Sequence, residues 1–448
     1  MKWTGSYDKC HIDHIDKKRW LFAMYTICFG IMVMLVFGRF LYYGKSFVGG
    51  ADGLSQVAPT MQYTGQYYRA LLKNILQGNL QIPMWDMSIG FGMNILQVIS
   101  FDPVYILCSV LFVHDIAVGI AIFDMLCLNL AGIMFIALCF NFGCNRLAAL
   151  AAALAYIFNG YILNYCIAQN TFLRLFIVLP MILLGVYNVT KKNRYGIFVL
   201  AVLYNITLGP LNIYTIGIVL IFCFCMAYIF SDRKKGVADF FSYIWKPVLI
   251  YILEMLVMAV FLIPTMYKVV SGGRIGNASI NFQWLYDVSY YRSLFHGLVG
   301  IDEIGIHGYL GVTTLAVLAV VSLVTRRKKN ILEKKLCVFG IIALFLAIFP
   351  IGSYLFNGGI GFNHRFLFVL DFYLCVVLAV MFPKLFELDL REKKKLFISA
   401  VIYIMVYALI SIWSDKNVDY AMEFMLFYLV LVMFGRKIKM SWVVGIVC

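Results

Sequence analysis

The chain is built from long apolar segments separated by short turns that contain lysine and arginine. An apolar segment of about 20 residues spans a bilayer as a helix, because a helix satisfies all of its own backbone hydrogen bonds in lipid. Hydrophobic residues make up 63% of the sequence and charged residues 13%, a balance that excludes a soluble globular protein. We therefore expect an all-α polytopic membrane protein with about twelve transmembrane helices. The expected spans are roughly 20–42, 117–141, 147–167, 171–189, 195–208, 211–230, 246–267, 308–325, 336–354, 366–385, 396–413 and 418–435.

Basic residues lie on alternate turns of this pattern, which fixes its expected orientation. Lys17, Lys18 and Arg19 precede the first span, and later clusters include 191–194, 233–235, 326–329, 393–395 and 436–439. Positively charged turns stay in the cytoplasm, so both termini are expected there in a multi-pass protein of the bacterial cell membrane. The net charge of +15 is then an orientation signal, and no nucleic-acid partner is expected. The first span is too long for a cleavable signal peptide.

The expected organisation is one transmembrane domain with short ends. Residues 1–19 form a cytoplasmic segment, 20–440 the transmembrane domain, and 441–448 a short tail or the start of a further span. The outer face is expected to carry three longer loops, at 45–103, 268–307 and 356–365. The apolar run 104–113 is too short to cross the bilayer.

The first outer loop is the longest polar stretch in the first quarter of the chain. Asp52 and Gln56 lie one helical turn apart after Gly49 and Gly50. The spacing of apolar residues from Met61 to Leu76 predicts a helix lying on the membrane surface, so this large loop is expected to contain interfacial helices. Loops of this length between spans are commonly functional.

Charged side chains of the outer loops are the candidates for chemistry. Asp52, Asp86 and Asp102 lie in the first loop, and His364 and Arg365 at the start of the tenth span. The second loop adds Lys268, Arg274, Tyr290, Arg292, His296, Asp302, Glu303 and His307. A carboxylate can orient or deprotonate an acceptor hydroxyl while guanidinium groups neutralise a phosphate leaving group. The alternative is that these are ordinary solvated loop charges.

Three carboxylates lie within expected spans, at Asp124, Glu254 and Asp371. Such groups face the interior of a helix bundle. They suit a proton relay in a transporter, or they pair with Arg174 or with a backbone donor. The twelve cysteines are scattered through apolar runs, as expected for small buried residues rather than a disulfide framework.

Several motifs resemble the YfhO-type bacterial membrane proteins. They are ADGLSQ at 51–56, GN at 78–79, PMWD at 83–86, GFGMN at 90–94, FNGY at 158–161, GYLG at 308–311 and NHRF at 363–366. YfhO-type proteins resemble the GT-C glycosyltransferases, multi-span enzymes that use polyprenyl-phosphate sugars at the outer face. The resemblance implies a GT-C-like fold and a link to teichoic acids or other envelope polymers.

The same resemblance implies roles for particular residues. Asp52 matches the first-loop aspartate that serves as catalytic base or orients the acceptor, and Arg365 an arginine that holds the donor phosphate. Trp85 is expected to stack on a sugar or to anchor the loop at the interface. Because no second acid adjoins Asp52, no metal ion or other cofactor is expected. The full set of expected substrate-binding residues is Gln56, Trp85, Asp86, Arg292, His364 and Arg365.

The leading hypothesis is therefore a glycosyltransferase (a hexosyltransferase) embedded in the lipid bilayer. It moves a sugar from a polyprenyl-phosphate donor to a cell-envelope polymer acceptor such as teichoic acid. A flippase or transporter of lipid-linked glycans is the alternative. Pro264 and the pair Gly209-Pro210 interrupt spans, a feature that transporters also show. A non-catalytic scaffold is the third possibility.

Overall fold

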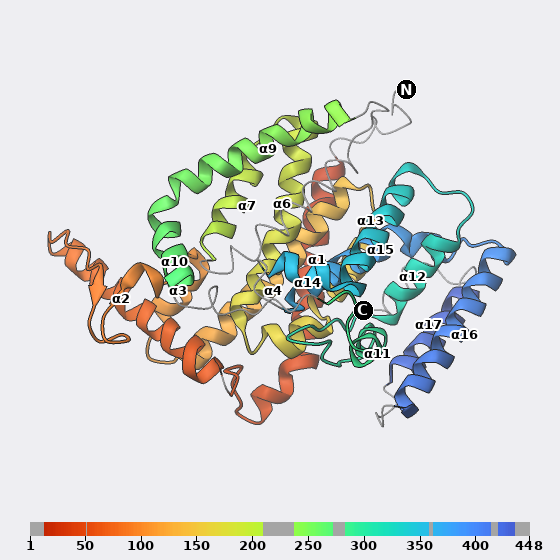
Figure 1. Cartoon of the computed structure of the whole chain (residues 1–448), viewed down its shortest axis with the longest axis horizontal. Coiled ribbons are helices and arrows are strands. Elements are labelled where there is room, and N and C mark those ends of the chain that lie inside the picture. The colour runs from red at the N-terminus through yellow and green to blue at the C-terminus, as the bar shows by residue number, and fades with distance from the viewer. Residues whose placement is uncertain are drawn as a thin grey trace.

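The computed structural model describes residues 13–50, 52–208, 237–271, 283–357, 362–413 and 420–434. Regular structure in these ranges is almost entirely helical (Figure 1), which confirms the expected all-α class. The strands among the described residues form one small antiparallel hairpin, β1 (Trp85–Asp86) and β2 (Met93–Asn94), with Trp85 opposite Asn94.

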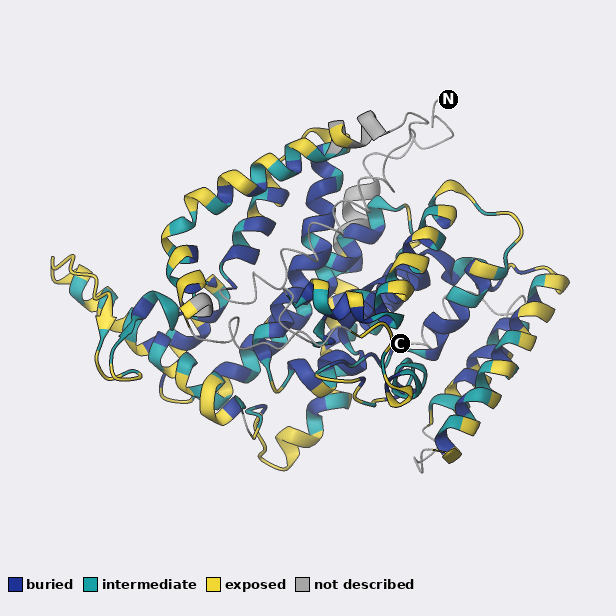
Figure 2. Ribbon diagram, viewed as in Figure 1, coloured by how far each residue is buried: buried dark blue, intermediate teal, exposed yellow. Residues whose placement is uncertain are grey.

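Five helices pack together at the centre of the molecule, and Figure 2 shows that their residues are mostly buried. These helices carry apolar residues on all of their faces, as expected of helices enclosed by others. The most hydrophobic 18-residue windows of 170–192 and 365–385 are 89% buried, compared with 22% for the outer helices α1 (Asp13–Tyr42) and α16 (Leu390–Trp413). The central helices are α4 (Ile116–Asn141), α5 (Arg146–Ile157), α6 (Leu173–Lys192), α12 (Thr314–Thr325) and α15 (Phe368–Leu385).

Among the described residues, five helices are long and apolar enough to cross a membrane, or seven if each of two bent pairs is one span. The shorter apolar helices α5, α7 (Gly196–Ile206), α12 and α17 (Ala421–Phe434) coincide with other expected spans. The expected span 211–230 lies outside the described residues. The count of twelve therefore stays a prediction.

Two expected spans are bent pairs rather than straight helices. α9 (Val237–Val257) and α10 (Ala259–Ser271) meet at 77°, and α13 (Ile331–Ile348) and α14 (Pro350–Phe356) meet at 91°. Pro350 starts α14, a position where its missing N–H costs nothing, while Pro264 removes a backbone donor inside α10. Pro350 holds Phe349 in an extended conformation and so separates α13 from α14. The break between α9 and α10 lies at Met258, before Pro264.

The expected surface helix of the first loop is present as α2 (Ala58–Leu76). It packs on α3 (Pro103–Leu111), a short helix formed by the apolar run at 104–113. Contact is close at Gly65, where a Cβ atom would lie 2.1 Å from the Ser109 carbonyl oxygen. Both helices lie at one end of the molecule, next to α10 (Figure 1). Another short helix, α11 (Val288–Gly297), packs against α16.

Two of the glycine motifs join by backbone hydrogen bonds. The Gly160 N–H donates to the Gly311 carbonyl at 3.0 Å, and the Tyr161 N–H to the Leu310 carbonyl at 2.9 Å. A Cβ on Gly160 would lie 2.7 Å from the Leu310 oxygen, and Gly311 adopts a φ of +69°. Only glycine fits both positions without strain. This junction interrupts the helix expected at 147–167, which ends at Ile157 and resumes as the π-helical turn η3 (Ile162–Cys166).

The third motif, at 363–366, joins the same junction. The His364 N–H donates to the Ile306 carbonyl at 3.0 Å, and the Tyr161 hydroxyl donates to the Arg365 carbonyl at 3.0 Å. Three segments separated by about 150 and 50 residues thus meet beside the start of the 3-10 turn η5 (Arg365–Leu367). Their meeting point positions the candidate site.

Candidate functional site

Asp52 is held by two side-chain amides. It is the N-cap of a second π-helical turn, η1 (Gly53–Val57), and is half-buried. The Gln56 Nε2 donates to Asp52 Oδ1 at 2.8 Å, and the Gln169 Nε2 donates to Asp52 Oδ2. Two donors on one carboxylate fix its orientation. Single-turn π-helices occur frequently at functional sites. Here η1 follows Asp52 and contains Gln56, and η3 precedes Gln169.

Gln56 was expected at the site from its spacing, and the structure places it on Asp52. Gln169 was missed. Its signal in the sequence is a pair of amides, Gln169 and Asn170, that interrupts two long apolar runs. Gly53 also has a definite role, because a Cβ there would lie 3.2 Å from the Val48 carbonyl carbon. The glycine therefore allows the turn to pack closely against the preceding chain.

Arg365 lies among aromatic rings with its backbone fixed. Its N–H donates to Asn363 Oδ1 at 3.0 Å. The guanidinium carbon is 5.1 Å from the ring centre of Phe172 and 6.0 Å from that of Tyr165. Its Nε is buried and has no hydrogen-bond partner among the described residues. A guanidinium in this state retains donors for an anionic ligand.

His307 links Asp52 and Arg365 electrostatically. Its backbone has a φ of +58°, and its ring centre lies 5.5 Å from that of Tyr165. Burial, followed by the positive charge of Arg365, lowers the pKa of His307, against opposing effects of Glu303 and Asp52. The imidazole is therefore neutral at pH 7. The cluster of Asp52, Tyr165, His307 and Arg365 brings together groups from the first loop, η3, the second loop and η5.

His364 supports this cluster by binding the backbone next to His307. It is 3% exposed, and its Nδ1 accepts a hydrogen bond from the Ile306 N–H at 3.1 Å. Burial lowers the pKa of His364 to about 4. Gly305, with a φ of +62°, leaves room for the ring, since a Cβ there would lie 2.6 Å from it. His364 thus braces the backbone next to His307, which differs from the direct substrate contact expected of it.

The other expected site residues lie in different surroundings. Asp86 Oδ2 accepts from the Tyr63 hydroxyl at 2.7 Å, and its Oδ1 accepts from Ser88. The Ser88 and Tyr63 hydrogen bonds lower the pKa of Asp86, which braces the hairpin on α2. Trp85 is 60% exposed on that hairpin. None of the contacts found in the described ranges joins these residues to the Asp52 cluster.

Arg292 also lies apart from the cluster. Its guanidinium carbon sits 3.7 Å from the ring centre of Trp413, at the end of α16. The contact joins α11 to α16 and places Arg292 among helices that do not carry Asp52. Its expected role in substrate binding has no geometric support in this arrangement.

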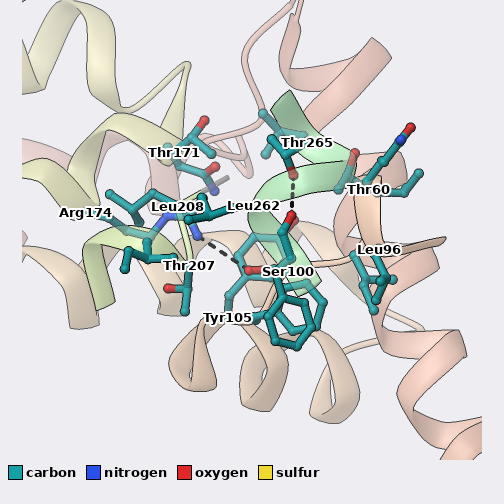
Figure 3. Close-up of a pocket in the computed structure, with 18 of the residues that line it drawn as sticks. Thr60, Leu96, Ser100, Tyr105, Thr171, Arg174, Thr207, Leu208, Leu262 and Thr265 are labelled. Carbon is teal, nitrogen blue, oxygen red and sulfur yellow. Dashed lines mark hydrogen bonds between the residues drawn. The ribbon is translucent and has the colours of Figure 1, made fainter. Parts of the chain in front are cut away.

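A cavity of about 210 Å³ adjoins Asp52 on the side of α10. Gln56 and Gln169, the two donors to Asp52, both line it. Figure 3 shows hydroxyl groups and one arginine facing this space from several elements. The labelled polar residues are Thr60, Ser100, Thr171, Arg174, Thr207 and Thr265.

Arg174 is neutralised by Asp102 in the wall of this cavity. Their side chains are 5% and 0% exposed, and Nη1 lies 3.6 Å from Oδ2. Asp102 also caps α3 through Val104 and Tyr105 and accepts from the Tyr204 hydroxyl at 2.8 Å. Asp102 is therefore the N-cap of α3 rather than a free loop charge. Its pairing with Arg174 was missed, because Arg174 was considered as a partner for acids within the spans.

Those acids remain without such a partner. Both oxygens of Asp124, Glu254 and Asp371 are buried and lack hydrogen bonds within the part of the chain that is described. They lie on three different helices, α4, α9 and α15. Over the same residues, no group of three or more His, Cys, Asp or Glu side chains has an arrangement that could hold a metal ion.

Comparison with known proteins gives a family over nearly the whole chain. The family model described as bacterial membrane protein YfhO matches residues 24–448. No curated protein and no solved structure matches the chain significantly. The matched range includes every motif of the junction and all four residues of the Asp52 cluster.

Proposed function

Because the chain belongs to the YfhO family of bacterial membrane proteins, we propose that it is a membrane glycosyltransferase that uses a lipid-phosphate sugar donor. One observation supports this proposal above the others. A carboxylate with a fixed orientation, Asp52, shares a cluster with Arg365, a half-shielded cation that retains hydrogen-bond donors. Neutral His307 lies within electrostatic reach of both.

Each group has a part in the proposed reaction. An acceptor hydroxyl oxygen bonds to the anomeric carbon of the donor sugar while the bond from that carbon to the phosphate oxygen breaks. The hydroxyl proton passes to the Asp52 carboxylate, and the phosphate leaves with the bonding electrons. Arg365 stabilises the negative charge on the leaving group, as preorganised donors do in a site of low polarity.

The surroundings of Arg365 suit a lipid-linked donor. Phe172 and Tyr165 flank the guanidinium at 5.1 and 6.0 Å and shield part of it from water. A charge-assisted contact with phosphate is stronger where water is excluded. The donor is proposed to be a polyprenyl-phosphate sugar, and the acceptor a cell-envelope polymer such as teichoic acid.

The test separates a transferase from a flippase of lipid-linked glycans. Purified protein is placed in liposomes with polyprenyl-phosphate glucose, carrying a label in the sugar, and a teichoic acid acceptor. A transferase converts the labelled lipid to free polyprenyl phosphate and labelled polymer in equal amounts. Movement of intact labelled lipid between leaflets, without release of polyprenyl phosphate, would instead favour the transporter.

A further inference from the structure

The hydrogen-bonding groups that line the cavity beside Asp52 are uncharged, apart from the Arg174 guanidinium. Hydroxyls come from Thr60 on α2, Ser100 before α3, Thr207 after α7 and Thr265 on α10. Carboxamides from Gln56, Gln97, Gln169 and Asn170 also face the space. Sites of this kind use a few placed polar groups to orient a ligand within a mostly apolar lining.

The charge of the cavity is balanced before any ligand enters. Arg174 is the sole cation and Tyr105 the sole other ionisable side chain among the lining residues described. Asp102, fully buried behind the wall, compensates Arg174 at 3.6 Å. An anionic ligand would have to compete with Asp102 for this guanidinium, whereas a neutral ligand needs only hydrogen bonds. The Arg174 Nε, which is buried and has no partner among the described residues, offers one such donor.

The size and lining of the cavity fit a single sugar ring. Its volume of about 210 Å³ exceeds the roughly 150 Å³ of a protein cavity that accepts benzene, another six-membered ring. Phe101 and Phe261, whose ring centres are 4.2 Å apart, provide an apolar surface within the lining. A sugar presents both hydroxyl groups and an apolar face, so it can use both parts of this wall.

From these observations we infer that the cavity between α2, α6, α7 and α10 is a binding site for an uncharged monosaccharide unit. The phosphate binds elsewhere, at Arg365. Gln56 and Gln169 connect the two, because each lines the cavity and donates to Asp52. The inference deepens the proposed function and rests on it for the part that Asp52 takes.

The experiment measures binding without requiring turnover. The full chain is reconstituted in nanodiscs, so that no glycoside detergent competes. The probes are octyl glycosides of glucose, galactose and N-acetylglucosamine, with octyl phosphate as the anionic counterpart. Thr265→Phe places a ring in the cavity. Thr190→Phe is the matched control, because both threonine hydroxyls donate to the carbonyl four residues before them and Thr190 lies outside the cavity.

We expect at least one octyl glycoside to bind the unchanged protein, and Thr265→Phe to weaken that binding at least tenfold. Octyl phosphate binding should stay within twofold of the unchanged protein, and Thr190→Phe should leave both probes unaffected. Thr60→Val removes a single hydroxyl without adding volume, and one lost hydrogen bond corresponds to a loss of about two- to tenfold.

Three outcomes would contradict the inference. The first is that no octyl glycoside binds, and the second is that Thr265→Phe and Thr60→Val leave glycoside binding unchanged. The third is that Thr265→Phe weakens the binding of octyl glycoside and of octyl phosphate equally. Equal weakening would mean that the cavity takes the alkyl chain. Failure of the proposed function looks different. In that case glycoside binding depends on Thr265 while labelled sugar never reaches the polymer.

Discussion

The Gln169 side-chain amide donates a hydrogen bond to Asp52 across 117 residues of sequence. This contact joins the first outer loop to the segment immediately before α6, which is as enclosed by its neighbours as α15. A loop carboxylate is thereby attached to the rigid centre of the protein. Precise placement of this kind is what a catalytic group requires.

Gln169→Glu should move the pH dependence of sugar transfer. A second negative charge next to the Asp52 carboxylate disfavours ionisation, so the acid limb of the pH–rate profile should shift to higher pH. Transfer at pH 6 should fall more than transfer at pH 8. Gln62→Glu, at an exposed position on α2, provides the control. An unchanged acid limb in Gln169→Glu would remove Asp52 from proton transfer.

Arg365→Lys should weaken use of the donor. Lysine keeps the charge but loses the planar fork that holds two phosphate oxygens, and it loses stacking on Phe172. We expect the KM for the polyprenyl-phosphate sugar to rise by about tenfold, the effect of losing about 1.4 kcal/mol of binding. Arg194→Lys, in a turn between α6 and α7, is the control. A donor KM equal to that of the unchanged protein would exclude Arg365 from the phosphate site.

Asp102→Asn should destabilise the protein. Asparagine still caps α3, but it leaves the Arg174 charge buried without a counterion. Breaking a fully buried pair costs about 3–5 kcal/mol, and the loss should appear as a lower Tm in detergent. The charge-removing double variant Asp102→Asn with Arg174→Met should recover part of that loss. A Tm unchanged in Asp102→Asn would show that the pair does not support the fold.

His364 should make stability fall as pH decreases. Its pKa is about 4 in the folded protein, compared with the ordinary 6.5, so the unfolded chain binds more protons between these values. Stability from the neutral ring is complete above about pH 6.5 and is lost progressively down to about pH 4. The lowered pKa of His307 acts in the same direction.

Tm measured from pH 7.5 to 4.5 tests this expectation. His364→Gln should lower Tm at pH 7.5 and flatten its decline towards pH 4.5. His114→Gln, beside Arg69 at the surface, should keep the full decline. An equally steep decline in His364→Gln would assign the acid sensitivity to other groups.

The helical class and the surface helix at 58–76 followed from the sequence, because hydrophobic periodicity is a local property. Motif resemblance also identified the segments around Gly160, Leu310 and Arg365 that prove to be in contact. The contact partners of individual polar side chains were harder to predict. Gln169 and Arg174 lie in apolar surroundings, and nothing local indicates that each faces an aspartate more than 70 residues away.

Pro264 was recognised as interrupting a span, but the size of the bend between α9 and α10 could not be predicted. Hydropathy gives the same average for a straight span and for the 77° pair of α9 and α10. That bend brings Thr265 and Phe261 over the cavity, so the proposed sugar site has no counterpart in the sequence pattern. The burial of His364 was also not predicted, because burial cannot be inferred from sequence for a residue in a loop.

The most direct test of the account is the rate of sugar transfer in Asp52→Asn. The substitution keeps the shape of the side chain but removes the charge and most of the basicity. Asp86→Asn is the matched control on the same loop, since Asp86 only braces the hairpin through Tyr63 and Ser88. Transfer from polyprenyl-phosphate glucose is measured in membranes with equal amounts of each protein. General-base assistance contributes about a hundredfold to ten-thousandfold, so Asp52→Asn should lose at least a hundredfold while Asp86→Asn loses little. Full transfer by Asp52→Asn, or an equal loss in both variants, would contradict the account.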